Sequence, residues 1–303
     1  MNKAPDIFKL PSALQCIDLG KWGISNHKVY VKRDDLIHHQ VAGNKWRKLK
    51  HNINYFLAGS YKGIVTLGGA HSNHILAPAF LGDFYNIPLT LLIRGEQPTH
   101  LSPTLKKCKE LGAALLFFSR KEYSSMVENS TKLKERWPNS LIIPEGGANQ
   151  MGILGCEDIV DEIDVDYDEI YCDVGTGATL AGISNKLVSH QLVKGVVVLK
   201  GAEYLHDQVL ELKANNQKEN FSLLHDYHFG GYAKNNSLLL KFMRDFYENT
   251  GIKTDPIYSG KMFYGLIDQL KKQTIPKTIV ALHSGGVQGN VGFEQRYKLK
   301  IFA

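Results

Sequence analysis

Short apolar runs alternate with longer segments of helical periodicity along most of this chain. Seven runs are typical of buried strands, because they are rich in β-branched residues and end at glycine or polar residues. They begin near residues 63, 87, 113, 140, 168, 193 and 277 and read GIVTLGG, IPLTLLI, AALLFFS, SLIIPEGG, DEIYCDVG, VKGVVVLKG and KTIVALHSGG. The first five start roughly 25 residues apart, close to one strand plus one helix, so the pattern predicts βαβ units and parallel sheets.

Three glycine-rich loops follow predicted strands, and parallel sheets bind ligands at the carboxyl ends of their strands. GGAHSNH (68–74) leads into an apolar helix from Ile75 that Ser72 or Asn73 would cap, with free amide groups suited to a carboxylate. GTGATLAG (175–182) opens another helix, and its small residues and threonine hydroxyls suit a phosphate monoester. SGGVQG (284–289) is the third such turn.

Composition limits the class of protein. The 303 residues carry a net charge of +6, and the 36 lysines and arginines are scattered, which favours small anionic ligands over nucleic acid. The start, MNKAPDIFKL, has no apolar core for a signal peptide, and no stretch approaches the ~18 apolar residues of a membrane span. The four cysteines form no CxxC pair. We expect a cytoplasmic protein without a membrane segment, a zinc knuckle or a disulfide framework.

The loop at 175–182 also has the GxG start of a dinucleotide-binding motif. Its sixth position is Leu180, it lies in mid-chain, and no acidic residue closes the next strand, so a nicotinamide cofactor is disfavoured. A Walker phosphate loop is absent from the sequence, because no GxxxxGK[ST] occurs.

The segment VAGNKWRKLK (41–50) contains four cations in its last six positions. A helix that starts at Lys45 with Asn44 as its cap would place Trp46, Leu49, Ile53, Phe56 and Leu57 on one apolar face, with Lys48 pointing well away from it. A lysine at the positive end of a helix is disfavoured as a cation, which lowers the pKa of its amine and favours the nucleophilic form. A solvated basic helix stays the alternative.

The whole set of motifs resembles one enzyme family. VKRDDL, GNKWRKLK, LGGAHSNH, the glycine-threonine turn, FGGYAKNNSLLLKF, TDPIYSGKMFYGLID and ALHSGGVQG are similar to the pyridoxal 5'-phosphate enzymes of the 1-aminocyclopropane-1-carboxylate deaminase / D-cysteine desulfhydrase family. The resemblance implies an α/β, tryptophan-synthase-β-like fold (fold type II) of two open, twisted, mostly parallel sheets flanked by helices. It also implies a large cofactor domain (1–48 and 152–303), a small inserted domain (49–151), an active site between them and a homodimer.

The resemblance assigns roles to individual residues. Lys45 aligns with the lysine that carries the cofactor covalently and then removes the α-proton of the substrate. The other cofactor contacts that it implies are Asn44, Asn73 at the 3'-oxygen, Gly175, Thr176, Gly177, Ala178 and Thr179 at the phosphate, and Ser259 at the pyridine nitrogen. The catalytic and substrate-binding residues that it implies, besides Lys45 and Asn73, are Ser72 at the substrate carboxylate, His74, Ser284 and the tyrosines Tyr232 and Tyr258, which stack on or donate to the substrate.

The residues at two positions, 259 and 284, favour D-cysteine desulfhydration over deamination of the cyclopropane amino acid. At these two places the deaminase-type members of the family carry sequences similar to YEG and HLGG. This chain carries Tyr258-Ser259-Gly260 and His283-Ser284-Gly285-Gly286 instead. A carboxylate at the ring nitrogen strengthens the electron sink that ring opening needs, and a serine is a weaker, neutral partner suited to β-elimination. We therefore expect D-cysteine desulfhydration to pyruvate, ammonia and sulfide, with deamination of the cyclopropane amino acid as the alternative.

Departures from the family pattern lie on the substrate side. They are Ala42 for glycine, His71 for glutamine, and Ile75-Leu76-Ala77 for a polar helix start. These departures leave open another D-amino acid or β-substituted alanine as the substrate. The HxxH pair of His71 and His74 has no third ligand in reach and no HExxH motif, so we expect no metal. The acidic run at 157–169 is typical of a solvated helix and loop rather than a calcium site.

Two other classes of protein share parts of this pattern. A non-catalytic amino-acid or phosphate-binding protein could use the same loops and would not need Lys45. A basic nucleic-acid module could use KWRKLK, but the apolar face leaves that helix half-buried and no recognition motif accompanies it.

Overall fold

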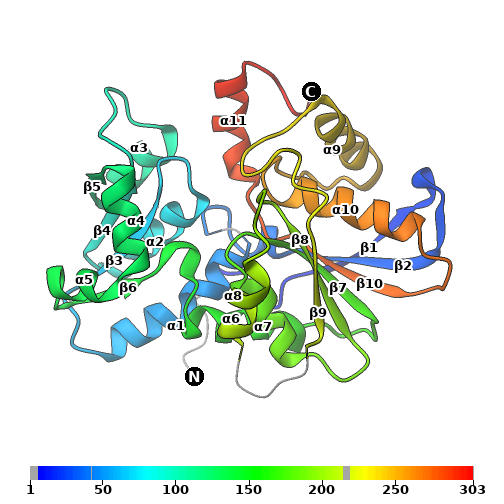
Figure 1. Cartoon of the computed structure of the whole chain (residues 1–303), viewed down its shortest axis with the longest axis horizontal. Coiled ribbons are helices and arrows are strands. Elements are labelled where there is room, and N and C mark those ends of the chain that lie inside the picture. The colour runs from blue at the N-terminus through cyan, green and yellow to red at the C-terminus, as the bar shows by residue number, and fades with distance from the viewer. Residues whose placement is uncertain (1–5, 42, 214–218, 303) are drawn as a thin grey trace.

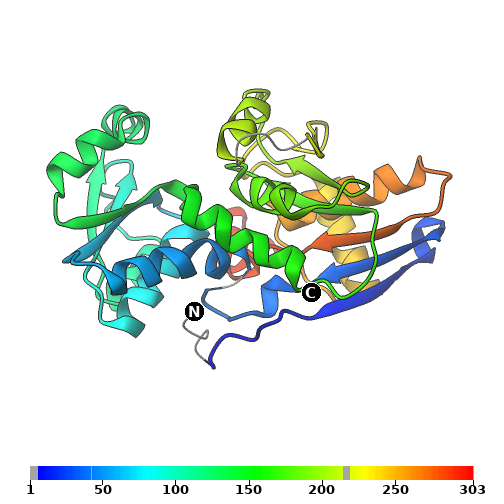
Figure 2. The same cartoon turned by 90° about the horizontal axis from the view of Figure 1, so that it is seen from below.

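The computed structural model describes residues 6–41, 43–213 and 219–302. Its strands form one large and one small sheet, and Figure 1 shows the two sheets in separate lobes. The helices α1 (Asn44–Ala58) and α6 (Gln150–Asp161) pack against each other, and Figure 2 shows them between the two lobes. The chain enters the small-sheet lobe through α1 and leaves it through α6.

The large sheet has six strands, and only its first pair is antiparallel. In spatial order the strands are β1 (Leu14–Leu19), β2 (Ile24–Lys32), β10 (Thr278–Leu282), β7 (Glu169–Val174), β8 (Leu192–Val197) and β9 (Phe221–Leu224). Alternate residues of one strand enter different cores, because successive side chains point to opposite faces. Ile279 and Ala281 pack toward α9 (Ser237–Thr250) and α10 (Ser259–Lys271). Val280 and Leu282 pack in the core with α6, α7 (Ala178–Lys186) and α8 (Leu205–Leu212).

The small sheet has four strands, and all of its pairs are parallel. In spatial order they are β5 (Ala114–Phe118), β4 (Leu89–Arg94), β3 (Gly63–Gly69) and β6 (Ser140–Ile143). One face is covered by α1, α2 (Asn73–Tyr85) and α3 (Pro103–Glu110), and the other by α4 (Arg120–Glu128) and α5 (Ser130–Arg136). Helices on both faces explain why these strands read as continuous apolar runs.

The remaining elements are short. They are α11 (Asn290–Tyr297) and the 3-10 turns η1 (Gly20–Trp22), η2 (Asp34–Leu36), η3 (Glu145–Gly147) and η4 (Val287–Gly289). Within the described ranges, no helix is long and apolar enough to cross a lipid bilayer.

The predicted fold class is confirmed, and all seven predicted strands are present. Strands β1, β2 and β9 escaped prediction; β1 and β2 carry exposed polar residues, and β9 has only four residues. The small sheet lies inside the predicted insertion at 49–151, whose boundaries stay a prediction.

The helix at the start of the basic segment differs from its prediction. It begins at Asn44, and Gly43 rather than Asn44 is the residue before it, with no side-chain cap. Trp46, Leu49 and Ile53 are buried as expected, whereas Leu57 is exposed. Lys48 is only 5% exposed, because the opposite face of α1 is covered as well.

The acidic run at 157–169 is not a solvated surface throughout. Glu162 accepts from Arg47 at 2.6 Å and from Lys32 at 2.9 Å, and Glu169 is 1% exposed beside Lys194 and Lys277. The cations that neutralise these carboxylates come from distant segments, which the local sequence does not show.

Candidate active site

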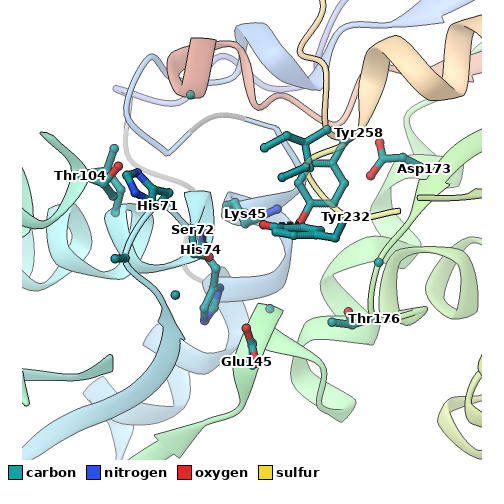
Figure 3. A pocket seen from close by; sticks show the side chains of 18 of the residues that line it. Lys45, His71, Ser72, His74, Thr104, Glu145, Asp173, Thr176, Tyr232 and Tyr258 are labelled. Atoms are coloured by element: carbon teal, nitrogen blue, oxygen red, sulfur yellow. Dashed lines mark hydrogen bonds between the residues drawn. The ribbon is translucent and has the colours of Figure 1, made fainter. Parts of the chain in front are cut away.

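A cavity of about 1140 Å³ lies where the two lobes meet, at the loops that follow the parallel strands. Its walls come from the first turn of α1, from the loop between β3 and α2, from the loop between β7 and α7, from Ile257 and Tyr258 directly before α10, and from α11. In Figure 3, Lys45 lies between Ser72 on the side of the small sheet and Thr176 on the side of the large sheet. The three glycine-rich loops that the sequence singled out all contribute residues to this region.

Gly43 fixes the place where α1 begins. Its φ of +69° is a backbone conformation that L side chains rarely adopt, and a Cβ atom there would lie 1.6 Å from the carbonyl oxygen of Ser284. The amide of Asn44 donates to that same oxygen at 3.1 Å. The start of α1 is therefore locked against the loop after β10, and Lys45 is held at the base of the cavity.

The Lys45 amine is in an environment that favours its neutral form. Its Nζ donates to Asn44 Oδ1 at 2.6 Å. Burial, followed by the charge of Lys48, lowers its pKa from 10.5 to about 8, and the nearby Asp173 opposes this shift in part. The solvated-helix interpretation is thus wrong for Lys45, which lines the cavity.

The loop from Gly175 to Thr179 presents backbone and hydroxyl groups to the cavity. Gly177, with φ +78°, precedes the first turn of α7, so the free amide groups of that turn face an incoming anion. Thr176 Oγ1 is buried without a hydrogen-bond partner in the described structure, and Thr179 Oγ1 accepts from Asn44 Nδ2 at 3.0 Å. Ala178 is fully buried behind the wall. This set suits a phosphate group.

The loop after β3 forms the opposite wall. Ser72 caps α2 by accepting from the amide of His74 at 3.1 Å, which confirms one of the two predicted caps. His74 is buried, and its Nε2 lies 2.9 Å from Thr66 Oγ1. Burial and the charges of Lys45 and Lys48 lower the pKa of His74 to about 3, so its imidazole is neutral at neutral pH. The side chain of Asn73 lies outside the described residues.

The two predicted tyrosines meet beside Lys45 (Figure 3). Their ring centroids are 6.0 Å apart and nearly perpendicular, and the Tyr258 hydroxyl donates to the Tyr232 hydroxyl at 3.5 Å. Burial raises the pKa of Tyr258 well above its ordinary value, and the Tyr232 hydroxyl raises it further. Both phenols therefore hold their protons at neutral pH and can donate them.

The other two predicted serines, Ser284 and Ser259, occupy different places. Ser284 is buried and lines a small pocket that adjoins the cavity at Lys45, and its hydroxyl donates to Asp173. Ser259 is fully buried and does not line the cavity; its hydroxyl donates to Asp255 Oδ2 at 2.7 Å and accepts from the Asp255 amide at 2.9 Å. The structure thus brings Ser284, but not the Ser259 hydroxyl, to the surface of the site.

Sequence reasoning missed most of the charged residues of the cavity, among them Asp173, Lys48 and Glu145. Asp173 is buried next to Lys45, and burial raises its pKa although the Ser284 hydroxyl opposes the shift. Lys48 and Glu145 also line the cavity. A carboxylate inside the apolar run EIYCDV, directly before the glycine-threonine turn, was the available signal for Asp173. Lys48 and Glu145 had no local signal, because only tertiary packing brings them here.

No group of three or more histidine, cysteine or acidic side chains in the described residues is arranged to hold a metal ion. His71, the first residue of the HxxH pair, lines the cavity, and burial and the charge of Arg296 lower its pKa.

The donor set fits pyridoxal 5'-phosphate. A buried amine of lowered pKa suits an aldehyde, and the unpartnered Thr176 hydroxyl with the start of α7 suits a phosphate. Residues 14–285 match the family model described as "Pyridoxal-phosphate dependent enzyme", which covers most of the chain. The chain belongs to the pyridoxal-phosphate dependent enzymes, and the predicted enzyme class and cofactor are confirmed.

Within that family, the chain is similar to proteins named as D-cysteine desulfhydrases and 1-aminocyclopropane-1-carboxylate deaminases. The chain is 30% identical to the "Bifunctional D-cysteine desulfhydrase/1-aminocyclopropane-1-carboxylate deaminase, mitochondrial" of Arabidopsis thaliana, over 86% of this chain and 73% of that protein. It is 25% identical to a D-cysteine desulfhydrase of Serratia proteamaculans, over 86% of each. A crystal structure of an ACC deaminase homologue superposes with a TM-score of 0.81 at 26% identity, covering 96% of this chain and 94% of that one. The predicted resemblance is confirmed.

Proposed function

We propose that this enzyme catalyses α,β-elimination of D-cysteine, with pyruvate, ammonia and sulfide as products. One water is consumed, and the Cα–H and Cβ–S bonds of the substrate are broken. The names of the Arabidopsis and Serratia relatives support this reaction class. Pyridoxal phosphate, when bound, supplies an electron sink for the charge that the α-carbon acquires when its proton leaves.

The residues proposed to hold the cofactor lie on two walls. Lys45 would hold its aldehyde carbon, and the loop from Gly175 to Thr179 would hold its phosphate. Asn44 links the two parts, because it accepts from Lys45 Nζ and donates to Thr179 Oγ1. This one amide therefore fixes the amine relative to the phosphate loop.

The substrate is proposed to bind on the side of the small sheet. The amino end of α2 and the Ser72 hydroxyl would receive its carboxylate, and the neutral His74 beside them adds no competing charge. Lys45, with a pKa of about 8, is suited to take the α-proton near neutral pH.

The leaving sulfur needs a proton donor. Tyr232 and Tyr258 are both protonated and line the cavity beside Lys45, and their hydroxyls share a hydrogen bond. We propose that one of these phenols protonates the thiolate as the Cβ–S bond breaks, and that the other stabilises the resulting phenolate.

Hydroxyl residues at positions 259 and 284 support elimination over ring opening. Ser284 lines the small pocket next to Lys45 and donates to Asp173, whereas the Ser259 hydroxyl donates to Asp255. Neither serine supplies the formal negative charge that would keep a pyridine nitrogen strongly protonated. Elimination of a good leaving group from Cβ can proceed with a weak electron sink, whereas opening of the cyclopropane ring needs a strong one. The two serines therefore favour cysteine over the cyclopropane amino acid as the substrate.

The observation that carries the proposal is the Lys45 amine itself, which is half-buried, lines the cavity beside the tyrosine pair and has a pKa lowered to about 8. The test incubates the holoenzyme with D-cysteine, L-cysteine and 1-aminocyclopropane-1-carboxylate and measures sulfide and keto acid. We expect sulfide and pyruvate from D-cysteine, and a Lys45→Ala variant without turnover. Keto acid from the cyclopropane substrate alone would establish the deaminase alternative instead.

We also propose a cytoplasmic homodimer with the domain boundaries stated above. The four cysteines are all free, which suits a reducing compartment, and the dimer follows the family resemblance. Light scattering of the purified holoenzyme tests the dimer through its molar mass.

A further inference from the structure

Four cations line the outer part of the cavity, on the side of the small sheet and on α11. We name Arg94, Lys107, Arg120 and Arg296 the basic rim. None of these four residues is proposed to bind the cofactor or the carboxylate of the substrate.

The parallel small sheet brings two rim residues to one edge. Arg94 ends β4 and is paired in register with Gly69 of β3, and a methyl group on Gly69 would lie 4.0 Å from Arg94 Nη2. The Arg94 guanidinium thus lies over the end of β3, directly before the Ser72 loop. Arg120 opens α4 two residues after β5 ends. Because β3, β4 and β5 run in the same direction, these arginines share the edge that carries the substrate loop.

The other two cations come from helices. Lys107 is on α3 together with Thr104, and Figure 3 shows Thr104 next to His71 at the outer part of the cavity. Arg296 is on α11, near enough to His71 that its charge adds to burial in lowering the pKa of that imidazole. The rim therefore faces the substrate loop from α3 and from α11.

The rim charge is left uncompensated by the protein. Within the described residues, Arg94, Arg120 and Arg296 form no ion pair, and Lys107 meets only the exposed Glu110 at 3.3 Å. Seven lysines and arginines line the whole cavity against two carboxylates, Glu145 and Asp173. A bound phosphate carries about −1.5 to −2 charges near neutral pH, and a zwitterionic amino acid carries none, so an excess of positive charge remains at the rim.

The cavity is also larger than the proposed substrate requires. Its volume of about 1140 Å³ exceeds the ~300–1,000 Å³ usual for sites that enclose drug-sized ligands. Space lined with cations therefore remains beyond a cofactor and a three-carbon amino acid.

We propose that the basic rim selects β-substituted D-alanines whose β-substituent ends in an anionic group. This inference rests on the proposed function, since it extends the D-cysteine reaction to a larger leaving group. A thioether substrate reacts with the same balance. The Cα–H and Cβ–S bonds break, and the thiolate leaves with its terminal carboxylate and takes up one proton. One water then hydrolyses the remaining three-carbon product to pyruvate and ammonia. The rim arginines would bind the distal carboxylate, as guanidinium groups do in charge-assisted pairs.

A matched pair of substrates tests the charge requirement. S-carboxymethyl-D-cysteine and its neutral amide, S-carbamoylmethyl-D-cysteine, have almost the same shape and differ in one charge. With the holoenzyme we expect a kcat/KM for the acid about tenfold or more above that for the amide, and a preference that shrinks as salt rises. Equal kcat/KM values for the two compounds would overturn the proposal.

Variants locate the effect. The double variant Arg120→Gln/Arg296→Gln should reduce the acid-to-amide ratio by about fivefold or more, because it removes two of the four rim charges. Lys121→Gln is the matched control, since Lys121 is exposed, follows Arg120 on α4 and does not line the cavity. A ratio that the double variant preserves, or that Lys121→Gln lowers equally, would show that the rim does not select the charge.

A binding experiment separates this inference from the proposed function. D-2-Aminoadipate and its 6-amide replace the sulfur with a methylene and cannot be eliminated, so calorimetric titration of the holoenzyme measures affinity alone. Tighter binding of the acid without turnover of D-cysteine would refute the proposed reaction and support the rim. Turnover of D-cysteine together with equal affinities for the acid and the amide would support the proposed reaction and overturn the proposed selectivity of the basic rim.

Discussion

At the scale of single residues, the site depends on cations that are removed from water. Lys45 follows the start of α1, and burial together with Lys48 lowers the pKa of its amine to about 8. Lys261 is fully buried on α10, where its ammonium donates to the carbonyls of His228 and Gly231 at 2.8 Å each. The first amine is placed to react, and the second holds the loop that carries Tyr232.

The lowered pKa of Lys45 predicts how the apoprotein takes up pyridoxal phosphate. Only the neutral amine is nucleophilic, and its pKa lies at about 8 rather than 10.5. The rate of covalent uptake should therefore rise with pH through about 8 and level off above it, as followed by cofactor absorbance. A rate that keeps rising toward pH 10.5, as for Nα-acetyl-lysine measured in parallel, would contradict this environment.

Lys261 is predicted to be a positioning residue for Tyr232. Lys261→Met keeps an unbranched side chain that is one atom shorter, but it leaves two carbonyls without their donor, at about 1–3 kcal/mol each. We expect a lower melting temperature and a lower kcat for elimination, with cofactor content unchanged. Lys271→Met, an exposed position on the same helix, is the control. An unchanged kcat in Lys261→Met would show that the loop keeps its place without this contact.

At the scale of elements, the beginnings of three helices converge on the site. The first turns of α1, α2 and α7 all line the cavity, and each follows a glycine or serine that sets the entry of the chain. Gly43 carries the tightest constraint, because it lies against the Ser284 carbonyl.

Gly43→Ala is predicted to displace the start of α1. The new Cβ would lie 1.6 Å from the Ser284 oxygen, so α1 and the loop after β10 would have to separate. We expect the variant to lose bound pyridoxal phosphate on dialysis, with a dissociation constant raised about tenfold or more, since misplacing reactive groups by an ångström is costly. Gly23→Ala also has a positive φ but open space around it, and it should retain the cofactor. Equal retention in the two variants would argue against the steric role.

The elements could be predicted where the pattern is local. The seven buried strands read as apolar runs, and the parallel order placed the glycine-rich loops together at the strand ends. The sequence did not reveal β1 and β2, whose residues are partly polar and exposed, or the start of α1 at Asn44. Asp173 and Lys48 reach the site through tertiary packing, and the Ser259 hydroxyl is turned toward Asp255 by a local bond that residue types alone do not specify.

At the scale of the whole molecule, a buried ionic network joins the lobes near the site. Arg47 of α1 donates to Asp34 and to Glu162, the residue directly after α6, and Lys32 of β2 also donates to Glu162. The network ties α1 and α6, the two connections between the lobes, to the edge of the large sheet. Its carboxylates therefore affect the stability of the entire fold.

Glu162 makes the stability of the protein sensitive to acid. Burial alone would raise its pKa, but hydrogen bonds and charge from Arg47 and Lys32 outweigh burial and lower the pKa from 4.5 to about 2. A lowered folded-state pKa stabilises the protein above pH 4.5, and that contribution is lost as pH falls through about 2. Urea unfolding across this window should show the loss.

Glu162→Gln should remove that part of the acid dependence and destabilise the fold by about 3–5 kcal/mol at neutral pH, because it leaves Arg47 partly uncompensated. Asp245→Asn, which breaks the exposed pair with Lys241, is the control and should cost less than about 1 kcal/mol. Equal costs for the two variants would contradict a stabilising role for the network.

Covalent labelling tests the central claim most directly. Borohydride reduction of the holoenzyme, followed by peptide mass mapping, should fix the pyridoxyl group on Lys45, whose amine lines the cavity and has a pKa lowered to about 8. Labelling of Lys48 or of any other lysine, or release of the cofactor without labelling, would contradict the account.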